Sequence, residues 1–272
     1  MTHAKRFSGQ VAIVTGGSLG VGRSTVLQLA AEGAHVVACA RRKPKLDELA
    51  ERVADLPGSM TAVALDVGDT DAFDALINQT AADHSRLDVL VNNAPSVIGG
   101  MIADQSLEEW RSNFGVGVDS VFIGTKAAFR TMIPQGSGSI VNVSSVSSLR
   151  AGIASGAYAA AKAALNQFSQ CAAMEGAAHN VRVNVVAPGA IDTPGFSAAT
   201  AKNDAVKKVI TDAIPMERAA QPEEVAQAIC FLASGDASFI TGVILPVDGG
   251  KTPQLYVPKF DITNLDNRAD RV

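Results

Sequence analysis

Short apolar runs alternate with longer stretches of helical periodicity along most of the chain. The runs predict strands, and the first, Val11-Ala12-Ile13-Val14, leads into a glycine turn and then a helix. Strands are expected at 11–15, 35–40, 60–65, 87–91, 138–143, 181–186 and 243–247, and helices at 20–32, 43–55, 70–84, 106–133, 156–178 and 222–234. This alternation predicts an α/β fold, a Rossmann-like doubly wound parallel sheet of seven strands with helices on both faces.

No linker divides the 272 residues, so a single domain is expected over 1–250, followed by a tail at 251–272. A hydrophobic content of 47% is enough to form a substantial core, and a net charge of −4 argues against nucleic acid as a partner. The sequence contains neither a run of about twenty apolar residues nor a signal-like segment, which predicts a cytoplasmic protein without a membrane partner. Cys39, Cys171 and Cys230 are interpreted as core thiols, and no metal site is expected.

A glycine-rich turn follows the first predicted strand, in the sequence Thr15-Gly-Gly-Ser-Leu-Gly-Val-Gly22. Glycines let the backbone approach a ligand closely, and the free N–H groups that open a helix suit a pyrophosphate. The turn therefore indicates a dinucleotide site, although an ordinary glycine-rich loop would have the same composition. The candidate contacts are Gly16, Ser18, Leu19, Gly20 and Gly22.

Tyr158, Lys162 and Ser145 are the candidate catalytic residues. Tyr158 and Lys162 are four residues apart, so their side chains project from one helical face. The lysine charge is expected to favour the phenolate and to lower the pKa of the tyrosine, which would make it a general acid or base. On a solvated helix face the same pair would have no function, so the interpretation depends on the motifs around it.

The order of these motifs resembles the short-chain dehydrogenase/reductase family over residues 9–250. The motifs are Thr15-Gly-x-x-x-Gly20-x-Gly22, Asp66-Val67, Asn92-Asn93-Ala94, Ser145, Tyr158-x-x-x-Lys162, Asn184 to Pro188-Gly189, and Thr241-Gly242 to Asp248-Gly249-Gly250. The resemblance implies hydride transfer between a nicotinamide cofactor and an alcohol or carbonyl. It assigns acid/base catalysis to Tyr158 and polarisation of the substrate oxygen to Ser145. It implies that Lys162 binds the nicotinamide ribose and lowers the pKa of Tyr158. It also implies cofactor contacts from Asp66, Val67, Asn92, Ala94, Pro188, Gly189, Ile191 and Thr193.

The end of the second strand bears on the choice of cofactor. An acidic residue there would accept hydrogen bonds from a ribose 2′-hydroxyl, but this chain has Ala40 followed by Arg41 and Arg42. Guanidinium groups bind phosphate bidentately, so NADP(H) is preferred over NAD(H), with NAD(H) kept as possible. Two observations argue the other way: the arginines could be exposed charge at a helix start, and Leu19 stands where NADP-preferring relatives often have Arg or Lys.

Two positions depart from the family pattern. Gly117 stands where the family usually has an asparagine that holds a water in a proton relay, and Asn113, one turn earlier, is a hypothetical substitute. Pro95 stands where glycine commonly follows Asn-Asn-Ala, so a backbone donor is lost beside the nicotinamide. These departures keep open a non-catalytic NADP-binding sensor or regulatory protein. A reductase of enone or dienoyl double bonds is the enzyme alternative.

The expected substrate is a neutral, hydrophobic small molecule. The pocket walls are predicted from 96–99, 149–155, Ala190 and 193–215; most of their side chains are small or apolar, and Arg150 is the exception. The loop 196–214 is interpreted as a lid. The resemblance implies a homotetramer or homodimer, for which the small side chains of Ala159, Ala160, Ala163 and Ala164 together with Phe168 would suit a helix interface. The tail contains Leu255, Tyr256, Val257 and Phe260, which would cover the chain's own pocket or a neighbouring subunit.

Overall fold

The computed structural model describes residues 5–193, 196 and 204–254. Its strands are β1 (Val11–Thr15), β2 (His35–Ala40), β3 (Ser59–Ala64), β4 (Val89–Asn92), β5 (Gly138–Val143), β6 (Val181–Pro188) and β7 (Ile244–Val247). The helices of eight or more residues are α1 (Gly20–Ala31), α2 (Lys43–Val53), α3 (Thr70–His84), α4 (Leu107–Phe114), α5 (Ser120–Gln135), α6 (Gly156–Ala177), α8 (Asp204–Asp212) and α9 (Pro222–Ala233). The predicted alternation of strands and helices is confirmed.

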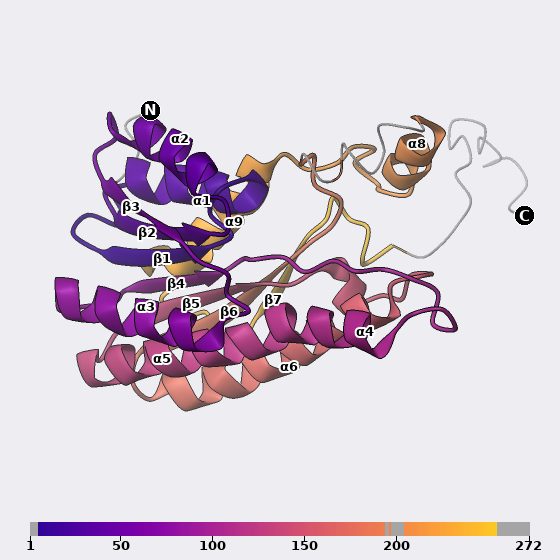
Figure 1. Ribbon diagram of the computed structural model, residues 1–272. Helices are drawn as coiled ribbons and strands as arrows, with labels where there is room; N and C mark the ends of the chain where they lie inside the picture. The colour runs from indigo at the N-terminus through magenta and orange to yellow at the C-terminus, as the bar shows by residue number, and fades with distance from the viewer. Residues whose placement is uncertain (1–4, 194–195, 197–203, 255–272) are drawn as a thin grey trace, which may run out of the picture.

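The seven strands form one parallel sheet in the order β3-β2-β1-β4-β5-β6-β7. The chain moves outward from β1 to β3 and then returns to the other side of β1 with β4. The carboxyl ends of β1 and β4 therefore diverge into connections on opposite faces, which opens a crevice between them. In Figure 1, α1, α2 and α9 cover one face of the sheet, and α3, α5 and α6 cover the other.

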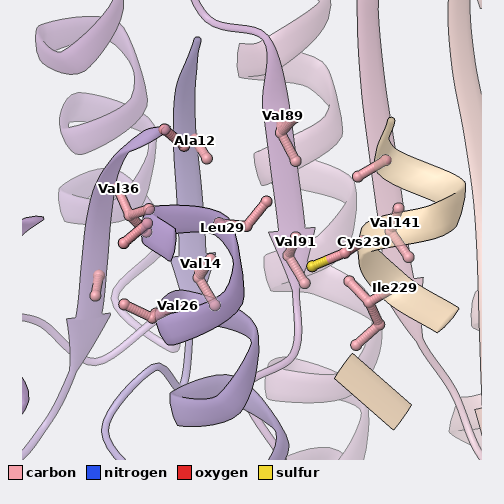
Figure 2. Close-up of a cluster of buried hydrophobic side chains, with 14 of the residues drawn as sticks. Ala12, Val14, Val26, Leu29, Val36, Val89, Val91, Val141, Ile229 and Cys230 are labelled. Atoms are coloured by element: carbon pink, nitrogen blue, oxygen red, sulfur yellow. The ribbon is translucent and has the colours of Figure 1, made fainter. Parts of the chain in front are cut away.

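Side-chain alternation along the strands produces two separate cores. Ala12 and Val14 of β1 point to the α1 and α9 face, where they join Val26, Leu29 and Ile229 in a fully buried cluster (Figure 2). Ile13 points to the opposite face and packs with Phe73 and Ile77 of α3, together with residues of α5 and α6. Because both faces are buried, the central strands β1, β4 and β5 are mostly apolar.

Three sequence predictions about the elements need correction. The expected helix at 106–133 is divided, because Gly115–Asp119 forms a π-helical segment between α4 and α5. The segment 196–214, predicted to be a loop, contains the helix α8; its residues 197–203 lie outside the described part, as do Leu255, Tyr256, Val257 and Phe260 of the tail. Cys39 and Cys230 are buried as predicted, but Cys171 is exposed on α6. Within the described residues, no helix combines the length and the apolar character needed to cross a membrane.

Candidate active site

A cavity of about 680 Å³ opens at the carboxyl ends of the strands, within the size range of small-molecule sites. Its walls come from the ends of the six strands β1 to β6, from the start of α1 and from α6, which are far apart in the sequence. The lining residues are Gly16, Ser18–Gly22, Cys39–Arg42, Leu65–Val67, Asn93–Ile98, Val116, Val143–Ser145, Tyr158, Lys162, Pro188, Gly189, Ile191 and Thr193. Every site residue predicted from the sequence except Asn92 lies in this set.

The glycine turn brings the backbone to one end of the cavity. Gly16 and Gly20 have positive φ values of 64° and 52°, which a side chain would strain. A Cβ atom on Gly22 would lie only 2.3 Å from the carbonyl oxygen of Gly16, so no other residue could replace it without a shift of the backbone. Leu19, the residue that precedes α1, makes no side-chain cap. The first N–H groups of α1 are therefore left for a ligand.

Thr15 and Asn93 join the ends of β1 and β4 beside this turn. The Thr15 hydroxyl accepts hydrogen bonds from the N–H groups of Asn93 and Ala94 at 2.9 and 3.0 Å. The Asn93 side chain donates in return to the Thr15 carbonyl at 2.9 Å and lines the cavity. Asn93 is thus a site residue that sequence reasoning missed.

Asn92, predicted to contact the cofactor, is directed elsewhere. Its side chain is buried in the sheet and donates to Oδ1 of Asn142 on β5 at 2.9 Å, and Asn142 donates to Ser169 of α6. Successive side chains of a strand alternate between faces, so only one of two adjacent asparagines can face the cavity. The Asn92 side chain therefore links β4, β5 and α6 and does not line the cavity, and its predicted contact with the cofactor stays a prediction.

Ser145 follows β5 at the start of a short 3₁₀ turn, Val146–Ser148. Its hydroxyl oxygen accepts a hydrogen bond from the Ser147 N–H at 3.1 Å, which leaves the hydroxyl proton free to point elsewhere. The hydroxyl of Ser145 also interacts with Tyr158, in the direction that lowers the pKa of the phenol. Ser145 and Tyr158 therefore present two hydroxyl groups to the same part of the cavity.

Tyr158 and Lys162 occupy successive turns of α6 on its cavity side, as the spacing predicted. Lys162 is 6% exposed, and its Nζ donates to the carbonyl of Val143 at the end of β5 at 2.8 Å. Burial lowers the pKa of this ammonium to about 8. The Nζ atom lies 6.0 Å from the centroid of the Tyr158 ring.

The pKa of Tyr158 departs from the sequence prediction. Burial raises it above 10, the usual value of tyrosine, and the hydrogen bond to Ser145 is the cause that acts in the opposite direction. The expected lowering by Lys162 is therefore wrong for the protein without ligand. Desolvation of the phenolate is the largest cause of the shift, and Lys162 is itself buried and partly neutral near pH 8.

Arg41 and Arg42 lie where β2 joins α2, at the far end of the cavity from Tyr158. Both are exposed, and neither guanidinium makes a hydrogen bond or ion pair with any residue that the structure describes. Asp66 lines the same end, where its Oδ1 accepts a hydrogen bond from the N–H of Gly68 at 3.0 Å. Two cationic side chains without partners thus face the cavity.

The two departures from the family pattern lie beside the site. Asn113 is buried, and its amide bonds to both backbone groups of Ile98 and to the Glu109 carbonyl. It holds the loop after Pro95 against α4, and the hypothesis that it substitutes at Gly117 is not supported by its contacts. Gly117 lies in the π-helical segment, where an added Cβ would meet the Cβ of Ala161 at an ordinary 3.6 Å.

Pro95, Ser96, Val97 and Ile98, which follow β4, line another part of the cavity. The predicted wall at 149–155 does not line it; Ala154 instead accepts a hydrogen bond from the Gly100 N–H at 2.9 Å, and Arg150 is exposed. Ala190 lines a neighbouring, smaller cavity near β7. Among the residues described, no three His, Cys, Asp or Glu side chains are grouped in a way that could hold a metal ion.

Comparisons with known proteins agree with this geometry. A family model described as Enoyl-(Acyl carrier protein) reductase matches residues 16–252. The 3-oxoacyl-[acyl-carrier-protein] reductase FabG of Thermotoga maritima is 38% identical over 245 residues, which are 90% of this chain and 98% of the relative. The meso-2,3-butanediol dehydrogenase of Serratia marcescens is 36% identical over 256 residues, 94% of this chain and 99% of the relative.

A solved structure from Beutenbergia cavernae, described as a candidate NAD(P)-dependent gluconate 5-dehydrogenase, contains NADP at low occupancy. It superposes with a TM-score of 0.86 at 37% sequence identity, covering 91% of this chain and 98% of its own. The residues matched by the family model, 16–252, include Gly16, Gly20 and Gly22 of the glycine turn and the whole of α6. The chain therefore belongs to the short-chain dehydrogenase/reductase family of NAD(P)-dependent oxidoreductases.

Proposed function

We propose that the protein is an NADP(H)-dependent alcohol dehydrogenase or carbonyl reductase that transfers hydride between the nicotinamide and a carbonyl or secondary alcohol. One observation carries this proposal. Ser145, Tyr158 and Lys162, which come from β5 and α6, line the same cavity as the glycine turn at the end of β1. A proton donor and a glycine turn suited to a dinucleotide thus line one cavity.

The residues present fit a dinucleotide. The close approach of Gly22 to Gly16 leaves no room for a side chain but brings backbone N–H groups to the surface of the cavity. The uncapped start of α1 is suited to a pyrophosphate, and Arg41 and Arg42 are suited to a 2′-phosphate. A bound nicotinamide would supply or accept the hydride. In this proposal Asp66, Val67, Ala94, Pro188, Gly189, Ile191 and Thr193 complete the cofactor contacts.

The side chains at the other end carry out the proton chemistry. Reduction of a carbonyl develops negative charge on its oxygen, and the hydroxyls of Ser145 and Tyr158 stabilise that charge by hydrogen bonding. Tyr158 then donates its proton to the oxygen. Because burial raises its pKa, the phenol is protonated at neutral pH and is ready to act as the acid. Lys162, held by the Val143 carbonyl, supplies a cationic donor beside the tyrosine and a contact for the nicotinamide ribose.

A neutral, largely apolar substrate suits the walls of the cavity. Val97 and Ile98 line it, and no charged side chain among its described lining residues lies on that side except Lys162. The relatives named above act, by their names, on a 3-oxoacyl group and on a diol. These names support a carbonyl or secondary alcohol as the reacting group of this protein also.

Two other functions share the same fold. The matching family model is described as an enoyl reductase, which favours the reduction of a carbon–carbon double bond as the enzyme alternative. Ser145 beside Tyr158 argues for a carbonyl instead, since two donors converge where one oxygen would develop charge. A non-catalytic NADP-binding sensor would account for Gly117 and Pro95, but it gives no role to the hydroxyl groups of Ser145 and Tyr158, which line the same cavity.

The first experiment follows the absorbance of the reduced nicotinamide with NADPH and NADH in parallel. The panel contains ketones, 3-oxoacyl thioesters, keto sugars and enoyl thioesters. We expect oxidation that depends on a carbonyl, is faster with NADPH, and falls by about a thousandfold or more in Tyr158→Phe, because the variant loses both the proton and a hydrogen-bond donor. Turnover of enoyl substrates alone, or tight NADPH binding without any turnover, would contradict the proposal.

A further inference from the structure

The hydroxyl of Ser148 is the centre of a small hydrogen-bond network behind Ser145. Ser148 Oγ donates to the carbonyl of Ser145 at 2.5 Å, and its backbone N–H donates to the same carbonyl at 3.0 Å. The side chain of Asn166 on α6 donates through Nδ2 to Ser148 Oγ at 2.8 Å. Ser144 Oγ lies 3.3 Å from the same oxygen. The peptide that carries Ser145 is therefore fastened from two sides.

Asn166 belongs to the same face of α6 as the proposed catalytic residues. Tyr158, Lys162 and Asn166 are spaced by four residues, so their side chains lie one above another along the helix. Asn166 is 6% exposed, and its Oδ1 has no hydrogen-bond partner. A buried amide with one unsatisfied atom costs free energy, and a leucine of similar size would avoid that cost. The hydrogen bond that the Asn166 side chain makes is the one from Nδ2 to Ser148 Oγ.

We propose that Ser148 and Asn166 are positioning residues that hold the Ser145 hydroxyl against Tyr158, so that both hydroxyls address the same substrate oxygen. Neither residue lines the cavity, so each acts only through Ser145. The role rests on the proposed function, because it presupposes a reaction in which Ser145 and Tyr158 act together.

The hydrogen bonds link the turn after β5 to α6, the two elements whose relative position the reaction depends on. Ser145 lies on the turn after β5, and Tyr158 lies on α6, thirteen residues later. Lys162 ties the end of β5 to α6 through the Val143 carbonyl, and Asn166 ties the turn itself to α6 through Ser148. Misplacement of a reacting group by about 1 Å can cost about a hundredfold in rate, so a tether of this kind has a measurable effect on catalysis.

The test is a double-mutant cycle with the full-length protein, NADPH and the best carbonyl substrate of the panel. We expect Ser148→Ala and Asn166→Leu each to lower kcat by about tenfold, with little change in the KM for NADPH, because the cofactor contacts are untouched. Ser148→Thr keeps the hydroxyl and should recover most of the rate. Gln167→Ala, on the exposed side of α6, is the matched control and should behave as the wild type.

The decisive comparison adds each substitution to Ser145→Ala. A positioning role predicts no further loss of kcat in that background, because there is no hydroxyl left to position, whereas general damage to the fold would multiply the two losses. A second readout is the pH profile of reduction. Loss of the Ser145 hydrogen bond removes the interaction that lowers the pKa of Tyr158, so the fall in rate at alkaline pH should move to higher pH.

Multiplicative losses, or an unshifted alkaline limb, in an active wild-type enzyme would overturn the positioning role alone. A wild type without carbonyl turnover would overturn the proposed function as well. If Ser148→Ala does not fold, Asn166→Leu tests the same network from the helix side, because it removes the donor without opening a cavity.

Discussion

At the scale of single residues, Arg41 and Arg42 offer the sharpest test of the cofactor. Both guanidiniums face the cavity without a partner in the described part of the chain, and each could bind a 2′-phosphate that NADPH has and NADH lacks. A charge-assisted hydrogen bond contributes about 1.5–3 kcal/mol, which corresponds to about 10- to 100-fold in affinity. Arg41→Ala with Arg42→Ala should therefore raise the KM for NADPH by that factor and leave the KM for NADH nearly unchanged.

Lys43→Ala provides the control for this pair. Lys43 is the adjacent cation, but it forms an ion pair with Asp47 on α2 and does not line the cavity. Steady-state kinetics with NADPH and NADH compare the double variant with this control, in which we expect neither KM to change. An equal loss for NADPH and NADH in the double variant would mean that the arginines do not contact the phosphate.

The sequence predicts residues best where a motif fixes both identity and spacing. The glycine turn and the Tyr158–Lys162 pair line the cavity because a tight turn and a four-residue helical repeat leave little freedom. The roles of adjacent asparagines could not be predicted in the same way, because the exit of β4 decides which of Asn92 and Asn93 faces the cavity. The predicted lowering of the Tyr158 pKa was wrong for another reason. Desolvation depends on all the atoms around the phenol, not on one neighbour in the helix.

At the scale of elements, the segment between α4 and α5 differs most from its prediction. Helical periodicity runs through 106–133, but Gly115–Asp119 adopts a π-helical turn, and Val116 of this turn lines the cavity. Glycine has a low helix propensity, so the pair Gly115 and Gly117 marks a weak point in the helix. The sequence contained this signal, but the hydrogen-bond pattern that results depends on packing against α6, where Gly117 meets Ala161.

Gly115 provides a stability prediction with a matched control. An added Cβ at Gly115 or at Gly136 would meet nothing within 4 Å, so the two sites differ mainly in backbone conformation. Gly115 has helical angles of φ −54° and ψ −50°, whereas Gly136 ends α5 at a φ of 69°. Gly115→Ala should raise the free energy of unfolding by about 0.5–1 kcal/mol, and Gly136→Ala should lower it by about 1–2 kcal/mol.

Urea denaturation of both variants measures these changes directly. A loss of stability in Gly115→Ala would show that the π-helical turn needs a residue without a side chain. If the same variant were stabilised but slower in turnover, the turn would contribute flexibility beside the cavity.

At the scale of the whole molecule, the sheet arranges the site before any side chain is considered. Seven parallel strands bring their carboxyl ends to one edge, and the change of direction between β1 and β4 opens the crevice there. Strand and helix alternation was sufficient to predict this layout, because right-handed crossovers allow few other topologies. The position of a subunit interface could not be predicted in the same way, since it depends on which side chains are exposed on the folded surface.

The outer face formed by α5 and α6 carries the last prediction. Phe122 is 46% exposed and lies edge-on to the ring of Phe168 at 6.0 Å, and Met174 further along α6 is 66% exposed. The two helices run side by side over one layer of the molecule (Figure 1). Exposed large apolar side chains on one face favour an interface there, and a two-fold axis would pair this face with its copy.

We therefore expect the wild type to sediment as a dimer or tetramer, and Phe122→Glu to shift it to a smaller species, because the interface would bury an unpaired carboxylate. Phe122→Leu keeps an apolar side chain and should retain the assembly. Sedimentation velocity over a range of protein concentrations measures the shift, and circular dichroism confirms that each variant is folded. An unchanged mass for folded Phe122→Glu would locate the interface, if there is one, on a different face.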